Sequence, residues 1–304
     1  MTNQEKYQKP MEPWPSLKPF EKKIYLSEID INLFYYDSGD EEKTPVVMIH
    51  GLGDEADTWR HVFAPIAKHF RAIAIDLPGF GRSDKPDRDY TPEFMKKAII
   101  GLSDRLHLSE MILMGSSMGG ILAQSLALEH AQRIKGLILV GGALLQVDPM
   151  GDKGLMLMKL PFLGEWLYTR LRKNPDAAFE SLRSVYFNLD QLPEPDRDFL
   201  FQRVNQRVWD NGQRRAYFSS LRHLFSWVKL SQVNLPDLLA HLTTPTLVVR
   251  GEFDALMSAK NAEGLINGQP NATLATIKTA GHLPHQEQPS DFVNIVLKWF
   301  SELG

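Results

Sequence analysis

MILMGSSMGGILA, residues 111–123, is the stretch of sequence that decides the fold. Its first half is an apolar run typical of a buried strand, and its second half begins an apolar helix. Between them, Gly115, Ser117 and Gly119 fit the pattern G-x-S-x-G. Small residues on both sides of the serine let a strand turn sharply into a helix, and the turn projects the central side chain from the sheet edge. A glycine-rich turn that binds nothing, or a phosphate, is the alternative, but the flanking strand and helix favour a nucleophile at Ser117.

Apolar runs and helical patterns alternate on both sides of this stretch. Strands are predicted at Ile24–Asp30, Ile31–Asp37, Val46–His50, Arg71–Asp76, Glu110–Gly115, Ile134–Val140, Thr246–Arg250 and Ala272–Lys278. Helices are predicted around Thr58–Phe70 and Pro92–Leu106, from Met118 onward, and from Pro289 to Glu302. Strands that are apolar on both faces and alternate with helices predict an α/β fold, with a mostly parallel central sheet and helices on both faces.

The alternation breaks between residues 142 and 236, where helical stretches occur without a convincing strand. We therefore predict one core, residues 21–141 plus 237–304, with a helical insertion at 142–236. Two sequential domains are the alternative. The elements that follow the insertion are too few to bury their own faces, so the sequence favours an insertion.

Composition excludes several classes of function. The 304 residues carry a net charge of −3, which leaves no overall positive field for nucleic acid. The chain has no cysteine, so disulfides, thiolate nucleophiles and zinc–thiolate or iron–sulfur sites are excluded. The glycine runs at 51–53 and 79–81 lack the third glycine of a dinucleotide-binding fingerprint.

The first twenty residues are predicted to be an N-terminal extension. Four prolines are expected to block regular helix there: Pro10, Pro13, Pro15 and Pro19. The segment has no apolar core typical of a signal peptide, and no apolar run in the chain approaches the ~20 residues of a membrane helix. We therefore expect a cytoplasmic protein without a transmembrane segment.

A serine hydroxyl is a poor nucleophile until a neighbouring base takes its proton. His282 lies in a loop after the last predicted strand, at the sheet edge where the carboxyl ends of parallel strands gather. His285 is a possible competing base but is expected to be a surface residue before a helix. The two histidines lack a nearby array of carboxylates, so we expect no metal site.

The base must itself be oriented by a third group. Asp254 lies in the turn after the penultimate predicted strand, Thr246–Arg250, and it is the predicted acid. Glu252 is the rival within the same turn, and Asp148 is a more distant rival after the strand that ends at Val140.

Together these segments resemble the serine-nucleophile, capped, esterase- or lipase-like branch of the α/β-hydrolase superfamily. The resemblance rests on His50-Gly51-Leu52-Gly53, Asp76–Asp84, Gly115–Gly119, Gly251–Asp254 and Gly281-His282, in the order serine, aspartate, histidine. It implies an oxyanion hole formed by the backbone N–H groups of Leu52 and Met118, and it requires no metal or organic cofactor. It also implies that residues 142–236 correspond to the cap.

The resemblance implies cleavage of small to medium apolar carboxylic esters through an acyl-enzyme on Ser117. Related epoxide hydrolases and haloalkane dehalogenases have aspartate in place of this serine and are excluded. A carbon–carbon bond hydrolase of dienone acids is an alternative, although many of those enzymes have tryptophan where Leu283 follows His282. A receptor-like binding protein with vestigial hydrolysis is another. The expected partner is a small molecule, and the oligomeric state is left open.

Two features of the insertion bear on the choice of substrate. Leu155–Leu163 is too apolar for a solvated connector, so we expect it to form cap core or to line the substrate entrance. The insertion also carries nine arginines. One of them turned inward would bind a carboxylate and would favour the dienone-acid alternative.

Overall fold

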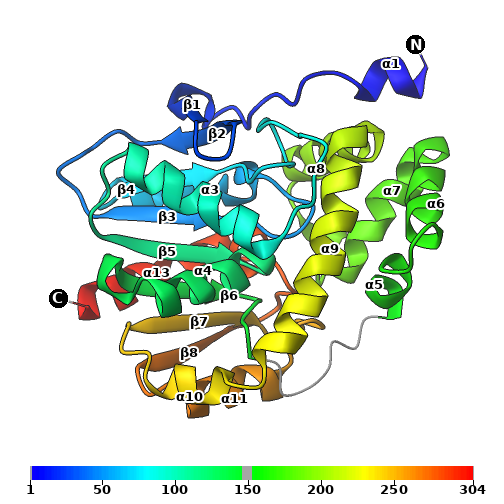
Figure 1. Cartoon of the computed structure of the whole chain (residues 1–304). Coiled ribbons are helices and arrows are strands. Elements are labelled where there is room, and N and C mark those ends of the chain that lie inside the picture. The colour runs from blue at the N-terminus through cyan, green and yellow to red at the C-terminus, as the bar shows by residue number, and fades with distance from the viewer. Residues whose placement is uncertain (1, 146–152, 304) are drawn as a thin grey trace.

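The computed structural model describes residues 2–145 and 153–303. An eight-stranded sheet runs through it in the order β1-β2-β4-β3-β5-β6-β7-β8 (Figure 1). The strands are β1 Glu21–Leu26, β2 Ile31–Asp37, β3 Pro45–Ile49, β4 Arg71–Ile75, β5 Met111–Ser116, β6 Ile134–Val140, β7 Thr246–Gly251 and β8 Ala272–Ile277. The β1–β2 and β2–β4 pairs are antiparallel, and every other pair is parallel. The predicted α/β fold with a mostly parallel sheet is confirmed.

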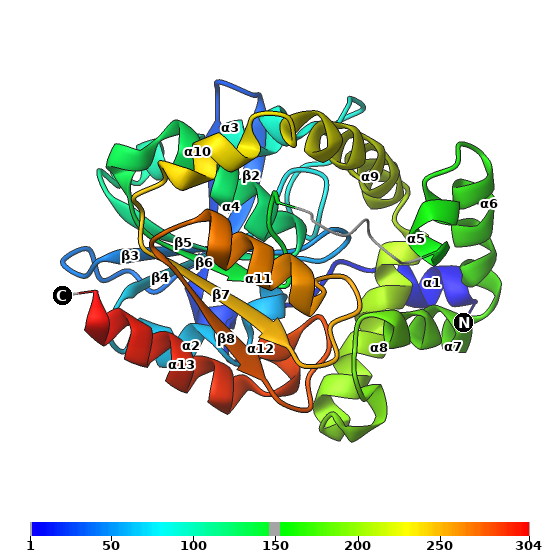
Figure 2. The same ribbon diagram turned by 90° about the horizontal axis from the view of Figure 1, so that it is seen from below.

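Helices cover both faces of this sheet (Figures 1 and 2). One face packs against α3 Pro92–Arg105, α4 Met118–Glu129, α10 Leu235–Ala240 and α11 Ala259–Gly268; the other packs against α2 Phe63–Ala67 and α13 Pro289–Glu302. Successive side chains of a strand point to opposite faces. In β3, Val47 and Ile49 therefore join one buried cluster, and Val46 and Met48 join the other.

Between β6 and β7, the described residues form helices and turns without a strand. The inserted helices are α5 Lys153–Met158, α6 Leu163–Arg170, α7 Pro175–Glu180, α8 Glu194–Trp209 and α9 Asn211–Ser231. They lie together beside one end of the sheet (Figure 1). At 21 residues, α9 is the longest helix of the described chain, and it is amphipathic.

A buried ion cluster joins α8 to the core. Arg203 Nε lies 2.9 Å from Glu55 Oε1, and Arg207 Nε donates to Glu55 Oε2 at 2.8 Å. Arg207 also pairs with Asp54. Burial opposes ionisation of Asp54, but Arg207 beside it holds the pKa of that carboxyl below its ordinary value. The cluster fixes α8 against the loop that follows β3.

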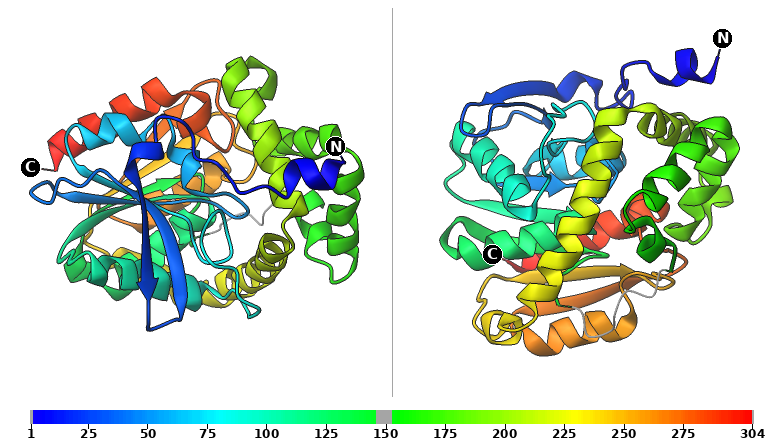
Figure 3. Two further views of the ribbon diagram at one scale, coloured as in Figure 1. Left: turned by 90° about the horizontal axis from the view of Figure 1, so that it is seen from above. Right: turned by 45° about the vertical axis from the view of Figure 1, so that its right-hand side comes forward.

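The N-terminal segment departs from the sequence expectation. A short helix, α1 Asn3–Tyr7, precedes all four prolines and is capped by Thr2, whose side chain accepts from the Glu5 N–H. It packs against α8 (Figure 3), and Tyr7 is buried. The expectation that these prolines exclude helix from residues 1–20 is therefore wrong for residues 3–7.

Two predicted elements differ from the structure by more than one residue at an end. The first strand ends at Leu26 rather than Asp30, because residues 27–30 form a turn in which Asp30 has a φ of 55°. The helix predicted around Thr58–Phe70 is divided into a 3₁₀ turn at Ala56–Trp59 and the short helix α2. Pro65 lies within α2, where its ring prevents a long regular helix.

Candidate active site

Ser117 stands at the turn between β5 and α4, with φ 52° and ψ −117°. This backbone conformation is strained for a residue with a side chain. The N–H of Ser117 donates to Val140 O at 2.7 Å, which ties the turn to the neighbouring strand. A Cβ on Gly115 would lie 2.2 Å from Gly119 O, and one on Gly119 would lie 2.3 Å from Ile49 O. The two glycines of the motif are therefore required by close backbone approach.

The structure brings His282 and Asp254 together. His282 Nδ1 lies 2.9 Å from Asp254 Oδ1, and both side chains are buried. The same Oδ1 accepts the N–H groups of Leu256 at 2.8 Å and Met257 at 2.9 Å. A carboxylate oxygen only accepts, so His282 donates through Nδ1–H and keeps the lone pair on Nε2. That Nε2 is buried and has no hydrogen-bond partner among the described residues.

The rivals of these residues lie elsewhere or outside the description. Glu252 is exposed and accepts the N–H of Thr279 at 3.3 Å. Asp148 lies outside the described residues. His285 is not a surface residue as expected: it is fully buried against the Trp59 ring, with ring centroids 4.5 Å apart. Burial lowers the pKa of His285 to about 3.

The loop that follows β3 lies against the serine turn. A Cβ on Gly51 would lie 3.2 Å from Ser117 Cβ, so the two backbones are in close contact. His50 Nε2 accepts the N–H of Leu77 at 3.0 Å, which leaves Nδ1–H to donate to Gly51 O at 2.7 Å. His50 therefore holds the loop that carries Leu52. Met118 is the first residue of α4, where backbone N–H groups have no acceptor within the helix.

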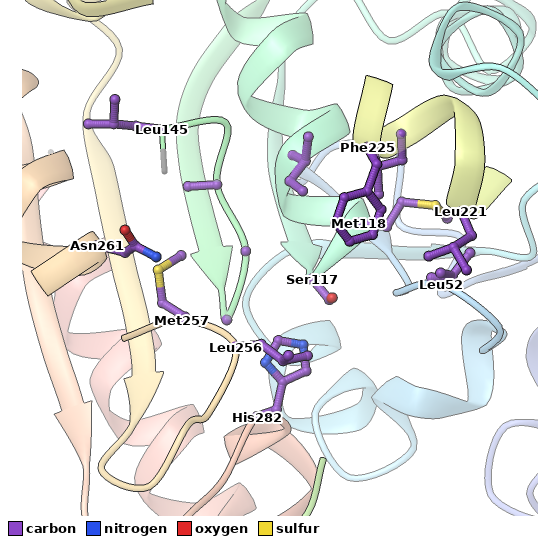
Figure 4. Close-up of a pocket in the computed structure, with 15 residues that line it drawn as sticks. Leu52, Ser117, Met118, Leu145, Leu221, Phe225, Leu256, Met257, Asn261 and His282 are labelled. Atoms are coloured by element: carbon purple, nitrogen blue, oxygen red, sulfur yellow. The ribbon is translucent and has the colours of Figure 1, made fainter. Parts of the chain in front are cut away.

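Ser117 and His282 share an apolar pocket of about 60 Å³ (Figure 4). Its walls come from the serine turn, the loop after β6, helix α9 and the segment after Asp254. The lining residues are Leu52, Ser117, Met118, Ile121, Gly141, Gly142, Ala143, Leu145, Leu221, Leu224, Phe225, Leu256, Met257, Asn261 and His282. Besides Ser117 and His282, Asn261 is the only polar side chain among these residues. The space suits a small apolar group.

No arginine or lysine is found among the residues that line this pocket. Arg203 and Arg207 belong to the buried cluster described above. Arg214 donates to Thr169 Oγ1, and Arg222 pairs with Glu165. These four arginines are thus engaged elsewhere in the described structure. None of the nine arginines of the insertion lines the pocket beside Ser117.

The apolar segment Leu155–Leu163 also departs from its expected place. Met156, Leu157, Leu160, Phe162 and Leu163 are exposed, and no residue of the segment lines the pocket. Its described side chains thus form neither cap core nor pocket wall.

Several residues of the site were not singled out from the sequence. Leu256 and Met257 act through backbone N–H groups, which no side-chain pattern reveals. Leu221, Leu224 and Phe225 lie on one face of α9, and their three- and four-residue spacing is the signal that predicts such a face.

Residues 2–145 and 153–303 include no group of three or more His, Asp or Glu side chains placed to hold a metal ion. The same residues include no helix that is both long enough and apolar enough to cross a bilayer.

Comparison with known proteins places this site in context. A dienedioate/trienedioate hydrolase (2-hydroxy-6-oxononadienedioate/2-hydroxy-6-oxononatrienedioate hydrolase 1) of Dechloromonas aromatica is 29% identical over 293 residues, covering 92% of this chain and 94% of that protein. The structure of 2-hydroxy-6-oxo-6-phenylhexa-2,4-dienoate hydrolase from Rhodococcus sp. strain RHA1 superposes with a TM-score of 0.76 at 22% identity, covering 92% of this chain and 98% of that one. A thermophilic esterase from Thermogutta terrifontis gives a TM-score of 0.73 at 25% identity, covering 93% and 98%. The family model described as the alpha/beta hydrolase fold matches residues 44–289, and on this ground the chain belongs to the α/β-hydrolase fold family.

Proposed function

We propose that the protein is a serine hydrolase that cleaves carboxylic esters with a small to medium apolar acyl group. The observation that carries this proposal is the arrangement of Ser117, His282 and Asp254 at an apolar pocket that has no cationic side chain among its described residues. A polarised serine is not needed by a protein that only binds its ligand. The receptor-like alternative is therefore less well supported.

In the proposed mechanism, Ser117 Oγ attacks the ester carbonyl carbon while His282 Nε2 takes the hydroxyl proton. Asp254 holds the imidazole with its proton on Nδ1 and stabilises the imidazolium that forms. The imidazolium then protonates the leaving alkoxide as the carbon–oxygen bond breaks, which leaves an acyl-enzyme. Water deprotonated by His282 attacks that acyl group and releases the acid and the free serine.

The negative charge that develops on the carbonyl oxygen needs donors that are already in place. Under this proposal, the backbone N–H groups of Leu52 and Met118 supply them. Each such donor contributes about 3–4 kcal/mol in related serine enzymes. The hydrogen bonds of His50 and the ion pairs of Arg207 hold the loop that carries Leu52, which supports the proposal that this donor is in place before substrate binds.

The size of the pocket bears on the acyl group. One water needs at least about 10–15 Å³ of this kind of volume. A pocket of about 60 Å³ is therefore suited to an acyl group of a few carbons. The polar side chains around it are those of Ser117 and His282, which have proposed roles in the reaction, and that of Asn261 on α11.

Carbon–carbon bond hydrolysis is the second candidate function. It is favoured by the relative from Dechloromonas aromatica, whose name specifies a dienedioate or trienedioate substrate. The pocket residues speak against it, because a dienone acid carries a carboxylate and no Lys or Arg side chain is found among them.

The deciding experiment measures kcat/KM for nitrophenyl acetate and butyrate and for a dienone acid, using the wild-type protein and Ser117→Ala. We expect preference for the esters and loss of turnover in the variant. Preference for the dienone acid by two orders of magnitude would transfer the assignment to the second candidate. Full activity of Ser117→Ala on every substrate would refute both.

A further inference from the structure

Helices α5 and α6 form a short hairpin, residues 153–170, that turns at Pro161–Phe162. The Gly164 N–H donates to Leu160 O at 3.0 Å and closes the turn. Gly164 is buried against α9, where a Cβ would lie 2.9 Å from Phe218 Cε1. Figure 1 shows the hairpin at the outer edge of the molecule, with α9 between it and the sheet. One side of the hairpin thus packs against α9, and its other side faces outward.

The outward side of the hairpin is more apolar than is usual for a surface exposed to water. Phe162 is 88% exposed at the tip of the hairpin, and Trp166 on the next turn is 52% exposed. Four further large apolar side chains are exposed with them: Met156, Leu157, Leu160 and Leu163. Single exposed apolar residues are normal, but a cluster of this kind marks an interaction surface.

The same segment is net positive. The hairpin, residues 153–170, contains three Lys and Arg residues and one Glu, in a chain whose net charge is −3. That acid, Glu165, is already paired with Arg222. Arg170 lies over the Trp166 ring, 4.3 Å from its centroid, so a cation stands directly beside the exposed aromatic group. Large apolar side chains among Lys and Arg are the composition of a segment that binds the surface of an anionic lipid layer.

The hairpin is also adjacent to the pocket. Arg222 Nε donates to Lys159 O at 3.1 Å, and Lys159 Nζ lies 4.9 Å from the centroid of the Phe225 ring. Phe225 lines the pocket that contains Ser117. A surface bound by the hairpin would therefore lie next to a wall of the pocket.

From these observations we propose that the α5–α6 hairpin docks on the surface of an anionic phospholipid bilayer, with Phe162 and Trp166 inserted at the headgroup level. The positive charge of the segment complements an anionic surface, whereas a second copy would bring two positive hairpins together. Docking of this kind would present the pocket to esters that partition into the membrane. The proposal is independent of ester hydrolysis, since docking is measured without substrate.

The test is co-sedimentation of the full-length protein with vesicles of phosphatidylcholine alone or with one third phosphatidylglycerol. We expect binding to the anionic vesicles, weakened by 0.5 M salt. The double variant Phe162→Ser/Trp166→Ser should bind at least about tenfold more weakly. The matched control is Leu238→Ser/Leu274→Ser, which removes two exposed leucines on α10 and β8 and should bind like the wild type.

Hydrolysis of a soluble short-chain ester, measured in parallel, keeps docking separate from catalysis. We expect all these variants to retain it. Equal vesicle binding by the wild type and the Phe162→Ser/Trp166→Ser variant would overturn the proposal, as would no binding by the wild type. So would a dimer in sedimentation velocity that the same variant converts to monomer, because a second copy would then cover the hairpin.

Discussion

Replacing Asp254 with asparagine tests how the structure holds the proposed catalytic imidazole. Oδ1 of Asp254 accepts three N–H groups: those of Leu256, Met257 and His282 Nδ1. Oδ2 has no hydrogen-bond partner among the described residues. An asparagine that placed its NH₂ at the Oδ1 position would face two backbone donors and lose both bonds. We therefore expect the amide oxygen to stay at that position, so that His282 keeps its proton on Nδ1.

The expected loss of activity follows from this geometry. A hydrogen bond to a charged group contributes about 1.5–3 kcal/mol and a neutral one about 0.5–1.5 kcal/mol. The lost charge on residue 254 should therefore raise the barrier by about 1–2 kcal/mol, which is about 5- to 30-fold in rate. A reversed tautomer would cost about 10⁴-fold.

The assay is kcat/KM for nitrophenyl acetate, with Asp254→Ala as the matched variant and thermal unfolding as the control for folding. Alanine removes the acceptor altogether, so it should lose far more activity than asparagine. If Asp254→Asn instead falls by about 10⁴-fold while remaining folded, the two backbone donors do not fix the oxygen and the reasoning fails.

Three further outcomes are expected. Ser117→Ala and His282→Ala should each abolish nearly all turnover with little change in Tm, and the double variant should be hardly slower than either, since the groups act as a unit; additive losses would contradict this. Arg207→Met should destabilise the fold by about 3–5 kcal/mol in urea unfolding, because the buried Glu55 and the largely buried Asp54 lose a shared cation, while Arg183→Met, at an exposed pair, should change stability little; equal effects would refute the role of burial. Burial lowers the pKa of His285 to about 3, so between about pH 6.5 and 3 this side chain binds a proton in the unfolded chain but not in the folded one. The free energy of unfolding should therefore fall as the pH is lowered through this range, by up to about 1.4 kcal/mol per pH unit. His285→Gln should reduce this slope in urea unfolding at pH 4.5 and 7, and an unchanged slope would assign it to other groups.

Local patterns predicted the parts of the fold that local forces determine. Ile134–Val140 and Pro289–Glu302 match β6 and α13 at both ends, because an apolar run or a proline at the first turn defines each boundary. Ser117 was predicted because its motif lies between an apolar strand and an apolar helix, the local context in which such a sharp turn occurs. For His282 and Asp254, the sequence predicted only that both residues lie at the same edge of the sheet, not how close their side chains are.

Long-range contacts were not predictable in the same way. The burial of His285 depends on the ring of Trp59, which is 226 positions away in sequence. Arg203 and Arg207 pair with Glu55, which is about 150 residues away in sequence. Charged residues on a helix have the same sequence pattern when their face is exposed to solvent, so the pattern does not reveal this pairing. The N–H groups of Leu256 and Met257 that bind the Asp254 carboxylate were not predictable from the sequence either.

The ion cluster that joins α8 to the core limits how freely the insertion could be exchanged between related proteins. A foreign insertion that lacks Arg203 and Arg207 would leave Asp54 and Glu55 as unneutralised anions in a dry junction. A chimaera built by cutting between β6 and β7 should therefore express poorly even where both parents are stable. Transplanting the insertion together with the two acidic residues that follow β3, as one set, should restore a folded hybrid.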